Sequence, residues 1–331
     1  MIRHPLVSVV IPTFNRARII GETIENMLQQ TYHRLEIIVV DDGSTDETPS
    51  VLESYGDRIR WIAQKNAGPS AARNAGLAIA KGEIIAFQDS DDIWHKTKIE
   101  RQVDLLERAG SSVVCCLCNC VVELSGKVAL SFDSAPLDAP VPEGIWLNVA
   151  EMLVTRCVLF NQAAAIRRDV LTKIGGFDIS FRVLEDFDLA LRLSLEGPWA
   201  FIREPLAVRR ERIENSLSKE ATPIVVAENW IRIQESLLRK VESRSHLAPL
   251  RNMIIKERDR AGRYLRAAKL ESSARFAERA AGWVLRWIER HRQGIYRRMP
   301  WFPRMSVSSV GAHREYKSGS ASFISSPVIR L

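Results

Sequence analysis

Four short apolar runs dominate the first ninety residues and limit what this chain can fold into. The runs are residues 6–14, 35–44, 59–64 and 83–92. Segments with helical periodicity separate them, and the clearest of these cover residues 17–30 and 69–82. Continuous apolar strands that alternate with helices are typical of a parallel sheet covered on both faces. The pattern predicts an open α/β sheet, and Ser44 with Glu47 predicts a capping box at the start of one more helix.

Polar residues follow three of these predicted strands at the point where each strand ends. The sequence reads PTFN after the first strand, DDGS after the second and DSDD after the fourth. In open α/β sheets, ligands bind outside the carboxyl ends of the strands. Three polar strand ends at one rim therefore predict a binding site at that edge of the sheet.

Three carboxylates crowd the end of the fourth strand, at Asp89, Asp91 and Asp92. Two like charges about 4 Å apart near a protein surface repel each other by roughly 4 kcal/mol. A divalent metal ion held by hard oxygen ligands would offset this repulsion. The alternative interpretation is an acidic turn whose side chains are freely solvated.

A second acidic pair, Glu185 and Asp186, stands at the start of an apolar-periodic segment that follows a glycine turn. The pattern predicts a helix that begins at this pair. Acidic side chains are favoured at a helix N-terminus by the helix dipole. The pair therefore has a purely structural explanation beside a catalytic one.

The five cysteines predict buried thiols rather than a metal centre. Cys116, Cys118 and Cys120 alternate along one predicted strand and would share a face of it. Zinc sites normally use C-x2-C pairs with a second pair further along the chain, and this sequence has no such arrangement. Reduced, buried cysteines are the expectation.

The charge of the chain is unevenly distributed. Residues 221–331 hold 22 Lys and Arg against 9 Asp and Glu, a balance of +13, whereas the rest of the 331 residues carries −6. Two parts with different partners are therefore expected. No run approaches the ~20 apolar residues that span a bilayer, and the N-terminus lacks the pattern of a secretory signal. We expect an intracellular protein without an integral anchor.

The basic end of the chain allows two interpretations. A helix over residues 274–292 would place Trp283 and Trp287 on an apolar arc, with Arg279 and Arg286 beside it. Such a helix suits an anionic membrane interface, or it docks on the α/β domain and uses its aromatic residues as core. Residues 301–331 are rich in Ser and are predicted to be disordered. No nucleic-acid-binding motif accompanies the charge, so a nucleic-acid partner is not expected.

Five motifs in order and spacing resemble those of family 2 glycosyltransferases. They are VSVVIPTFNR, VVDDGSTDET, QKNAGPSAARNAGL, FQDSDDIW and GGFD followed by LEDFDLALRL. The resemblance covers roughly residues 5–220. It implies a GT-A fold, in which a Rossmann-like, mostly parallel sheet flanked by helices binds the nucleotide and a second half binds the acceptor. The division expected is 1–110 for the nucleotide-sugar half, 111–220 for the acceptor half, 221–300 for a basic helical extension and 301–331 for a disordered tail.

The resemblance also implies a role for residues on the donor side. Asp42 would approach the base, commonly uracil, while Asp89 would touch the ribose side. Asp91 would coordinate Mn2+ or Mg2+ bridging the diphosphate, and Asp92 would assist the donor sugar or the local network. The other residues that would border the nucleotide sugar are Pro12, Thr13, Asn15, Asn66 and Arg73.

For catalysis, the resemblance implies an inverting sugar transfer with Asp186 as the base and Glu185 as the close alternative. An acceptor hydroxyl has a pKa far above 7, so a carboxylate must take its proton during attack. The departing diphosphate develops negative charge, which a metal ion stabilises. Two separate acidic clusters suit a single displacement that needs the base and the metal on opposite sides of the anomeric carbon.

The sequence departs from the family pattern at VRRERIENSLS (residues 208–218), where many relatives carry a His. Either a metal or phosphate ligand is missing here, or Arg210 or Arg212 replaces it. The Gln-x-x-Arg-Trp motif and transmembrane helices of processive members are absent, which indicates a hexosyltransferase that adds one sugar.

The resulting expectation is transfer from a UDP-sugar to a glycan or lipid-linked acceptor in envelope or extracellular polysaccharide synthesis. The place of action would be the cytoplasm, or the inner face of the membrane if the basic helices bind there. Two other classes remain open. A non-catalytic module that binds nucleotide-sugar or polysaccharide would retain donor binding without turnover. A nucleotidyltransferase would need a Gly-rich loop near the N-terminus, which IPTFNRARIIG does not supply.

Overall fold

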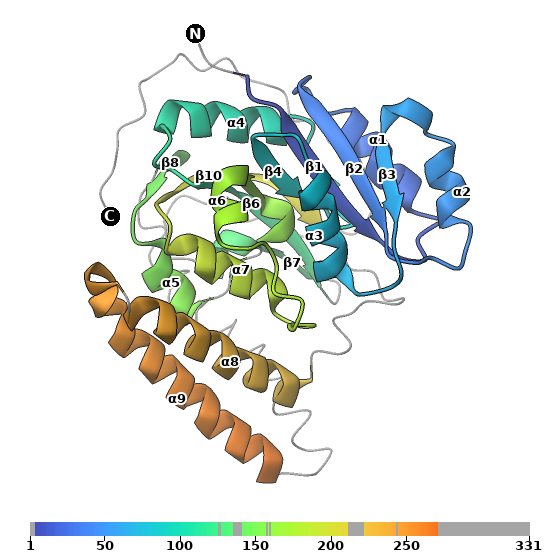
Figure 1. The fold of residues 1–331 in the computed structure, drawn as a ribbon. Helices are drawn as coiled ribbons and strands as arrows, with labels where there is room; N and C mark the ends of the chain where they lie inside the picture. Colours follow the sequence, from blue (N-terminus) through green and yellow to red (C-terminus); the bar gives the residue numbers. More distant parts are fainter. Residues whose placement is uncertain are drawn as a thin grey trace.

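The computed structural model describes residues 4–124, 127–134, 141–156, 158, 160–210, 222–242 and 244–270. One twisted sheet runs through the α/β part, with helices packed on its faces (Figure 1). Its strands are β1 (Val7–Thr13), β2 (Leu35–Asp41), β3 (Arg60–Ala63), β4 (Ile84–Phe87), β5 (Ile93–Trp94), β6 (Cys115–Leu124), β7 (Lys127–Leu130), β8 (Glu143–Trp146), β9 (Ala164–Arg167) and β10 (Trp199–Arg209).

The helices of these residues alternate with the strands in the first half and gather at the chain end. They are α1 (Ile20–Leu28), α2 (Thr48–Glu53), α3 (Pro69–Ile79), α4 (Lys98–Ala109), α5 (Val149–Thr155), α6 (Arg168–Lys173), α7 (Glu185–Ser194), α8 (Pro223–Glu242) and α9 (Ala248–Leu270). Short 3-10 turns lie at Gly56–Arg58, Ser131–Ser134, Asn161–Ala163 and Ser245–Leu247.

The strand order is β3-β2-β1-β4-β9-β6-β10-β5, with β7 added to β6 and β8 added to β10. β1 pairs in parallel with both β2 and β4, and β9 runs antiparallel between β4 and β6. Six strands of this path consequently point the same way, namely β3, β2, β1, β4, β6 and β10. The predicted mostly parallel sheet flanked by helices is confirmed.

The predicted strands and helices of the first half are present, with shorter bounds, but the predicted capping box is wrong. The Ser44 hydroxyl donates to the carboxylate of Asp41 instead of capping a helix. α2 begins at Thr48, whose backbone N–H donates to the carboxylate of Asp46 over 3.0 Å. Ser44 is unavailable because it also accepts a hydrogen bond from the backbone of Asn15 in the loop after β1.

The core lies on both faces of the sheet. Every residue of β1 and of β4 is buried, as expected for strands covered by helices on each side. Cys115, Cys116, Cys118 and Cys120 of β6 are buried free thiols, which confirms the prediction for those four. Burial raises the pKa of each of these thiols, so they remain protonated at neutral pH.

At the chain end, α8 and α9 form a helical hairpin, and α8 is the member that lies beside α7 (Figure 1). Trp230 of α8 stacks on Phe187 of α7, with ring centroids 4.6 Å apart. This part of the basic extension therefore docks on the α/β domain. The predicted helix over residues 274–292 and the predicted tail over 301–331 lie outside the described residues. Among the residues described, no helix combines the length and apolar character needed to cross a bilayer.

Candidate functional site

The strand order puts the topological switch point of the sheet at the carboxyl ends of β1 and β4, the edge called the crevice below. The chain leaves β1 for β2 on one side, and the other neighbour of β1 is β4, so the topology switches direction between β1 and β4. Ligands of doubly wound sheets bind at such a point. The loops after β1, β2 and β4 are the three polar strand ends predicted from the sequence, and they meet at this edge.

Asn15 ties the loop after β1 to the loop after β2. Its side-chain oxygen accepts a 2.8 Å hydrogen bond from the backbone of Thr45, and its own N–H donates to Ser44 Oγ over 2.8 Å. The backbone of Asn15 has φ 51°, in the left-handed region that Asn tolerates better than most residues. Pro12 and Thr13 are buried in β1, and the Thr13 hydroxyl has no partner among the described residues. Asn15 thus shapes this rim through its own contacts.

Asp42 is buried and organises the turn that leads into α3. Its carboxylate accepts hydrogen bonds from Gln64 Nε2 at 2.7 Å, from Ala67 N at 2.9 Å and from Gly68 N at 2.8 Å. Asn66 lies in the middle of this turn with its side chain exposed. The turn that Asp42 holds therefore presents Asn66 at the rim of the crevice.

Asp92 lies beneath the acidic loop rather than on its surface. Its two carboxylate oxygens accept hydrogen bonds from Gln162 Nε2 at 2.8 Å and from the backbone N–H of Arg210 at 3.0 Å. Burial, followed by the charges of Asp89 and Asp91, raises the pKa of Asp92 to about 8. Of the two roles expected for Asp92, its contacts favour the local network.

The acidic loop suits a divalent cation that takes most of its coordination from a bound molecule rather than from the protein. Within the described part of the chain, no three His, Cys, Asp or Glu side chains converge into a complete metal cage. The negative charge that raises the pKa of Asp92 is nevertheless concentrated here, and a cation would offset it. Mg2+ is usually bound by one or two carboxylates together with substrate phosphates and water. One carboxylate of this loop, such as the half-buried Asp91, would be enough for a site of that kind.

Arg73 connects the two acidic clusters. From α3, its Nη2 lies 2.7 Å from Asp89 Oδ1 and its Nη1 lies 3.1 Å from Glu185 Oε1. Its side chain is only 5% exposed, and its guanidinium lies 5.2 Å from the ring centre of Phe177. The sequence predicted two separate clusters. The structure brings them to the two terminal nitrogens of one buried guanidinium, which fixes the start of α7 relative to the acidic loop.

Asp186 is better suited than Glu185 to accept a proton. Burial, and then the charge of Glu185, raise the pKa of Asp186 to about 7, while Arg73 and the N–H of Phe187 oppose that rise. The Phe187 N–H donates to Asp186 Oδ1 over 2.8 Å. Glu185, in contrast, is engaged in the ion pair with Arg73. A carboxylate with a pKa near 7 is matched to base catalysis at neutral pH.

Arg210 is present where the family pattern expects a basic group, but its side chain faces another partner. Nη1 and Nη2 contact the two carboxylate oxygens of Glu22 at 2.9 and 2.7 Å. Contact with a diphosphate would require Arg210 to exchange this exposed pair for the new one. Arg212, the other predicted substitute, lies outside the described residues.

Two side chains were missed by the sequence reasoning. Phe14, directly after β1, is 42% exposed. Lys98 of α4 is fully buried, with Nζ 3.7 Å from the ring centre of Trp94 and 2.8 Å from Gln102 Oε1. An aromatic ring within the otherwise polar PTFN ending was the available signal for Phe14.

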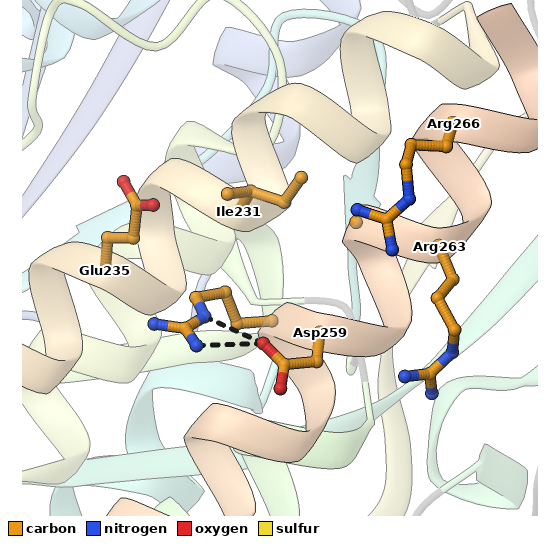
Figure 2. Close-up of a pocket in the computed structure, with 7 residues that line it drawn as sticks. Ile231, Glu235, Asp259, Arg263 and Arg266 are labelled. Carbon is orange, nitrogen blue, oxygen red and sulfur yellow. Dashed lines mark hydrogen bonds and ion pairs between the residues drawn. The ribbon is translucent and has the colours of Figure 1, made fainter.

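Two hollows in the described residues lie away from this crevice. One, of about 370 Å3, is formed between α8 and α9; Figure 2 shows Ile231 and Glu235 on one helix and Asp259, Arg263 and Arg266 on the other. The second, of about 560 Å3, lies at the amino ends of β2 and β3. None of the predicted site residues lines either hollow.

The chain is similar to known proteins over its α/β part. Residues 8–127 match the family model described as Glycosyl transferase family 2. The chain contains a family 2 glycosyltransferase domain. An uncharacterised glycosyltransferase of Rickettsia prowazekii is 33% identical over 188 residues, which cover 57% of this chain and 58% of the relative. TuaG of Bacillus subtilis, named for teichuronic acid biosynthesis, is 37% identical over 139 residues, or 40% of this chain and 51% of TuaG. The chain therefore matches little more than half the length of these relatives.

Solved structures with the same architecture confirm the GT-A fold of the family 2 domain. S. aureus TarS (residues 1–349), in complex with UDP-GlcNAc, has a TM-score of 0.65 at 19% identity, over 86% of this chain and 82% of TarS. A mannosyltransferase from Pyrobaculum calidifontis, in complex with GDP-Man and Mn2+, has a TM-score of 0.53 at 21% identity, over 89% of this chain and 84% of that enzyme. At these identities, the likeness concerns the fold.

Proposed function

We propose that this protein transfers one sugar from a nucleoside-diphosphate sugar to an acceptor hydroxyl, with inversion at the anomeric carbon. The observation that carries the proposal is the pair of acidic groups joined by Arg73. One end is the acidic loop at the switch point of the sheet, and the other is the start of α7, where Asp186 has a pKa raised to about 7.

The donor would bind in the crevice at the ends of β1, β2 and β4. The Phe14 ring and the turn held by Asp42 would border the base, and Asp89 would approach the ribose. Asp91 would hold Mn2+ or Mg2+ together with the diphosphate. The metal, when bound, supplies positive charge that stabilises the departing diphosphate. Pro12, Thr13, Asn15, Asn66 and Asp92 would shape this pocket rather than react.

Asp186 would act as the base in a single displacement. The acceptor oxygen forms its bond to the anomeric carbon as the bond from that carbon to the diphosphate breaks. The hydroxyl proton passes to Asp186, and the electron pair of the broken bond leaves with the diphosphate. Glu185, paired with Arg73, would keep the carboxylate pair oriented and would be the alternative base.

The nucleotide and the acceptor are proposed from the relatives. UDP is favoured because the TarS structure that covers 86% of this chain holds UDP-GlcNAc, and the name of TuaG favours an acceptor in envelope polysaccharide synthesis. The donor sugar is a hexose or a derivative of one. Addition of a single sugar fits the absence of the processive Gln-x-x-Arg-Trp motif from the sequence.

Donor binding can be tested by isothermal titration of UDP, GDP and dTDP with and without Mn2+. We expect one nucleotide to bind in a Mn2+-dependent manner, and Asp91→Asn to weaken that binding at least tenfold. Asp169→Asn is the matched control, because Asp169 is an exposed carboxylate on α6, away from the crevice. Equal affinity of wild type and Asp91→Asn in Mn2+ would refute the metal role of Asp91. If no nucleotide binds at all, the donor site itself is rejected.

We also propose that the basic end of the chain holds the enzyme at an anionic membrane surface, where a lipid-linked acceptor is presented. The net charge of +13 over residues 221–331 and the Trp and Arg pattern of residues 274–292 support this. Full-length protein should float with vesicles that contain anionic lipid at physiological salt and remain unbound with neutral vesicles. Equal recovery with both kinds of vesicle would contradict the proposal.

A further inference from the structure

We infer that α8 is a positioning element for the base, a role that presupposes the sugar transfer proposed above. α8 begins at Pro223, far beyond residue 127, where the match to the family model ends. It nevertheless lies beside α7, the helix whose first residues are Glu185 and Asp186 (Figure 1). The segments on both sides of Asp186 are in direct contact with α8.

On the N-terminal side of Asp186, α8 contacts the loop that leads into α7. Asn229 Nδ2 donates a 3.0 Å hydrogen bond to the carbonyl oxygen of Val183. Arg232 donates to Ser180 Oγ over 3.0 Å and lies 4.6 Å from the ring centre of Phe181. Asn229 is itself buried, so its contact with the loop is shielded from water. This end of α7 is therefore fixed by polar groups from α8.

On the C-terminal side of Asp186, α8 packs against α7 through an aromatic contact. The rings of Phe187 and Trp230 are stacked, with centroids 4.6 Å apart and planes 17° apart. Phe187 directly follows Asp186, and its N–H donates to Asp186 Oδ1. A shift of Phe187 would thus move a donor that opposes the rise in the pKa of Asp186.

Between these two contacts, the backbone adopts a conformation that needs support. Leu184, the residue before α7, has φ 67° in the left-handed region. Residues other than glycine occupy that region only when the surrounding structure holds them there. Asn229 and Trp230, adjacent in α8, supply contacts on the two sides of Leu184.

The far end of α7 is held by the segment that links α8 to α9. Arg244 donates to the carbonyl oxygen of Leu195 over 3.1 Å and to the carboxylate of Glu196 over 2.8 Å. Both ends of α7 are therefore attached to the C-terminal hairpin. Because α7 carries the base, the functional unit extends into residues 222–244.

The test compares Trp230→Ala and Asn229→Ala with Trp230→Phe and with Glu235→Gln. Glu235 is an exposed residue of α8 that lines the hollow toward α9 instead of contacting α7 (Figure 2). We expect both alanine variants to lower kcat by roughly 10- to 100-fold, the size of effect that a misplaced catalytic group produces. Their donor affinity should stay within about twofold of wild type, since these residues of α8 contact the segments that flank Asp186 and not the loops after β1, β2 and β4. Trp230→Phe should restore most of kcat, and Glu235→Gln should match wild type.

Hydrogen exchange gives a readout that does not depend on turnover. Amides of residues 184–188 should exchange faster in Trp230→Ala than in wild type, while amides of β1 and β4 keep their protection. Unchanged exchange at 184–188 would overturn the inference, as would a fall in donor affinity as large as the fall in kcat. If the wild-type protein transfers no sugar, the proposed function fails, while the exchange result still decides whether α8 orders the start of α7.

Discussion

Asp186→Asn is expected to lower kcat by between about 100- and 10,000-fold, the contribution that a general base typically makes. The amide cannot take the acceptor proton, but it is nearly the same size as the carboxylate it replaces. Donor affinity measured by titration should therefore stay close to that of wild type. A non-catalytic nucleotide-sugar-binding module would show donor binding without turnover in both proteins.

The pH dependence of the wild-type enzyme adds a second check on Asp186. Only the ionised carboxylate accepts a proton, so kcat/KM should rise with pH through about 7, where Asp186 loses its own proton. The rising limb of the pH–rate profile should be absent from the residual activity of Asp186→Asn. Glu185→Gln should retain that limb at a lower pH, because Glu185 is paired with Arg73 and its charge raises the pKa of Asp186 in the wild type. If Asp186→Asn kept more than a tenth of wild-type kcat, Asp186 would not be the base.

Arg73→Met is the second change with a large expected effect. It removes the shared partner of Asp89 and Glu185 and leaves both carboxylates, with Asp186, near one another without a counter-charge. Loss of one partner of a buried ion pair costs on the order of 3 kcal/mol of folding stability. We expect kcat/KM to fall about 100-fold or more. Its rising limb should move above pH 7, because Arg73 lowers the pKa of Asp186 in the wild type.

Two companion variants separate the site effect of Arg73 from general destabilisation. Arg73→Lys keeps the charge, but a single ammonium group cannot reproduce the fork that reaches two carboxylates, so an intermediate loss is expected. Arg58→Met removes an exposed pair with Glu25, whose side chains are 56% and 46% exposed, and should change little. Urea unfolding and pH–rate profiles of the four proteins make the comparison. An unshifted limb in Arg73→Met would show that Arg73 does not act on Asp186.

Local patterns were enough to predict much of the fold of the first ninety residues. The apolar runs that became β1, β2 and β4 read directly as buried strands, and the polar residues after them did meet at one edge. The helix that starts at Glu185 also followed from its apolar period. These features depend on neighbouring residues, which a sequence displays directly.

The contacts that join distant segments could not be read in the same way. Arg73 and Glu185 are 112 positions apart, and no local pattern assigns one guanidinium to two acidic clusters. Asp92 was expected to assist the donor sugar or the local network, but its partners were not evident: the side chain of Gln162 and the backbone of Arg210 reach it from distant parts of the chain. Lys98 is buried against Trp94 because α4 packs on the sheet there, a tertiary effect that its own charge argued against.

The same reasoning explains the outcome for the basic extension. Its helical character and charge were evident from composition, whereas docking on α7 depends on the match of Trp230 with Phe187. The sequence favoured neither membrane nor domain contact. In the structure, α8 contacts the α/β domain. The division of the chain at residue 220 stays a prediction.

The most direct test of the central claim is release of nucleoside diphosphate by the wild-type protein. Full-length protein would be given UDP-, GDP- and dTDP-sugars with Mn2+, with and without a bacterial envelope glycan fraction as acceptor, and assayed for diphosphate product. We predict that one donor class is turned over, faster with acceptor than without it. Chelation of the metal should stop turnover, as should Asp186→Asn. Turnover of no donor by protein that binds nucleotide would contradict the account and identify a binding module instead.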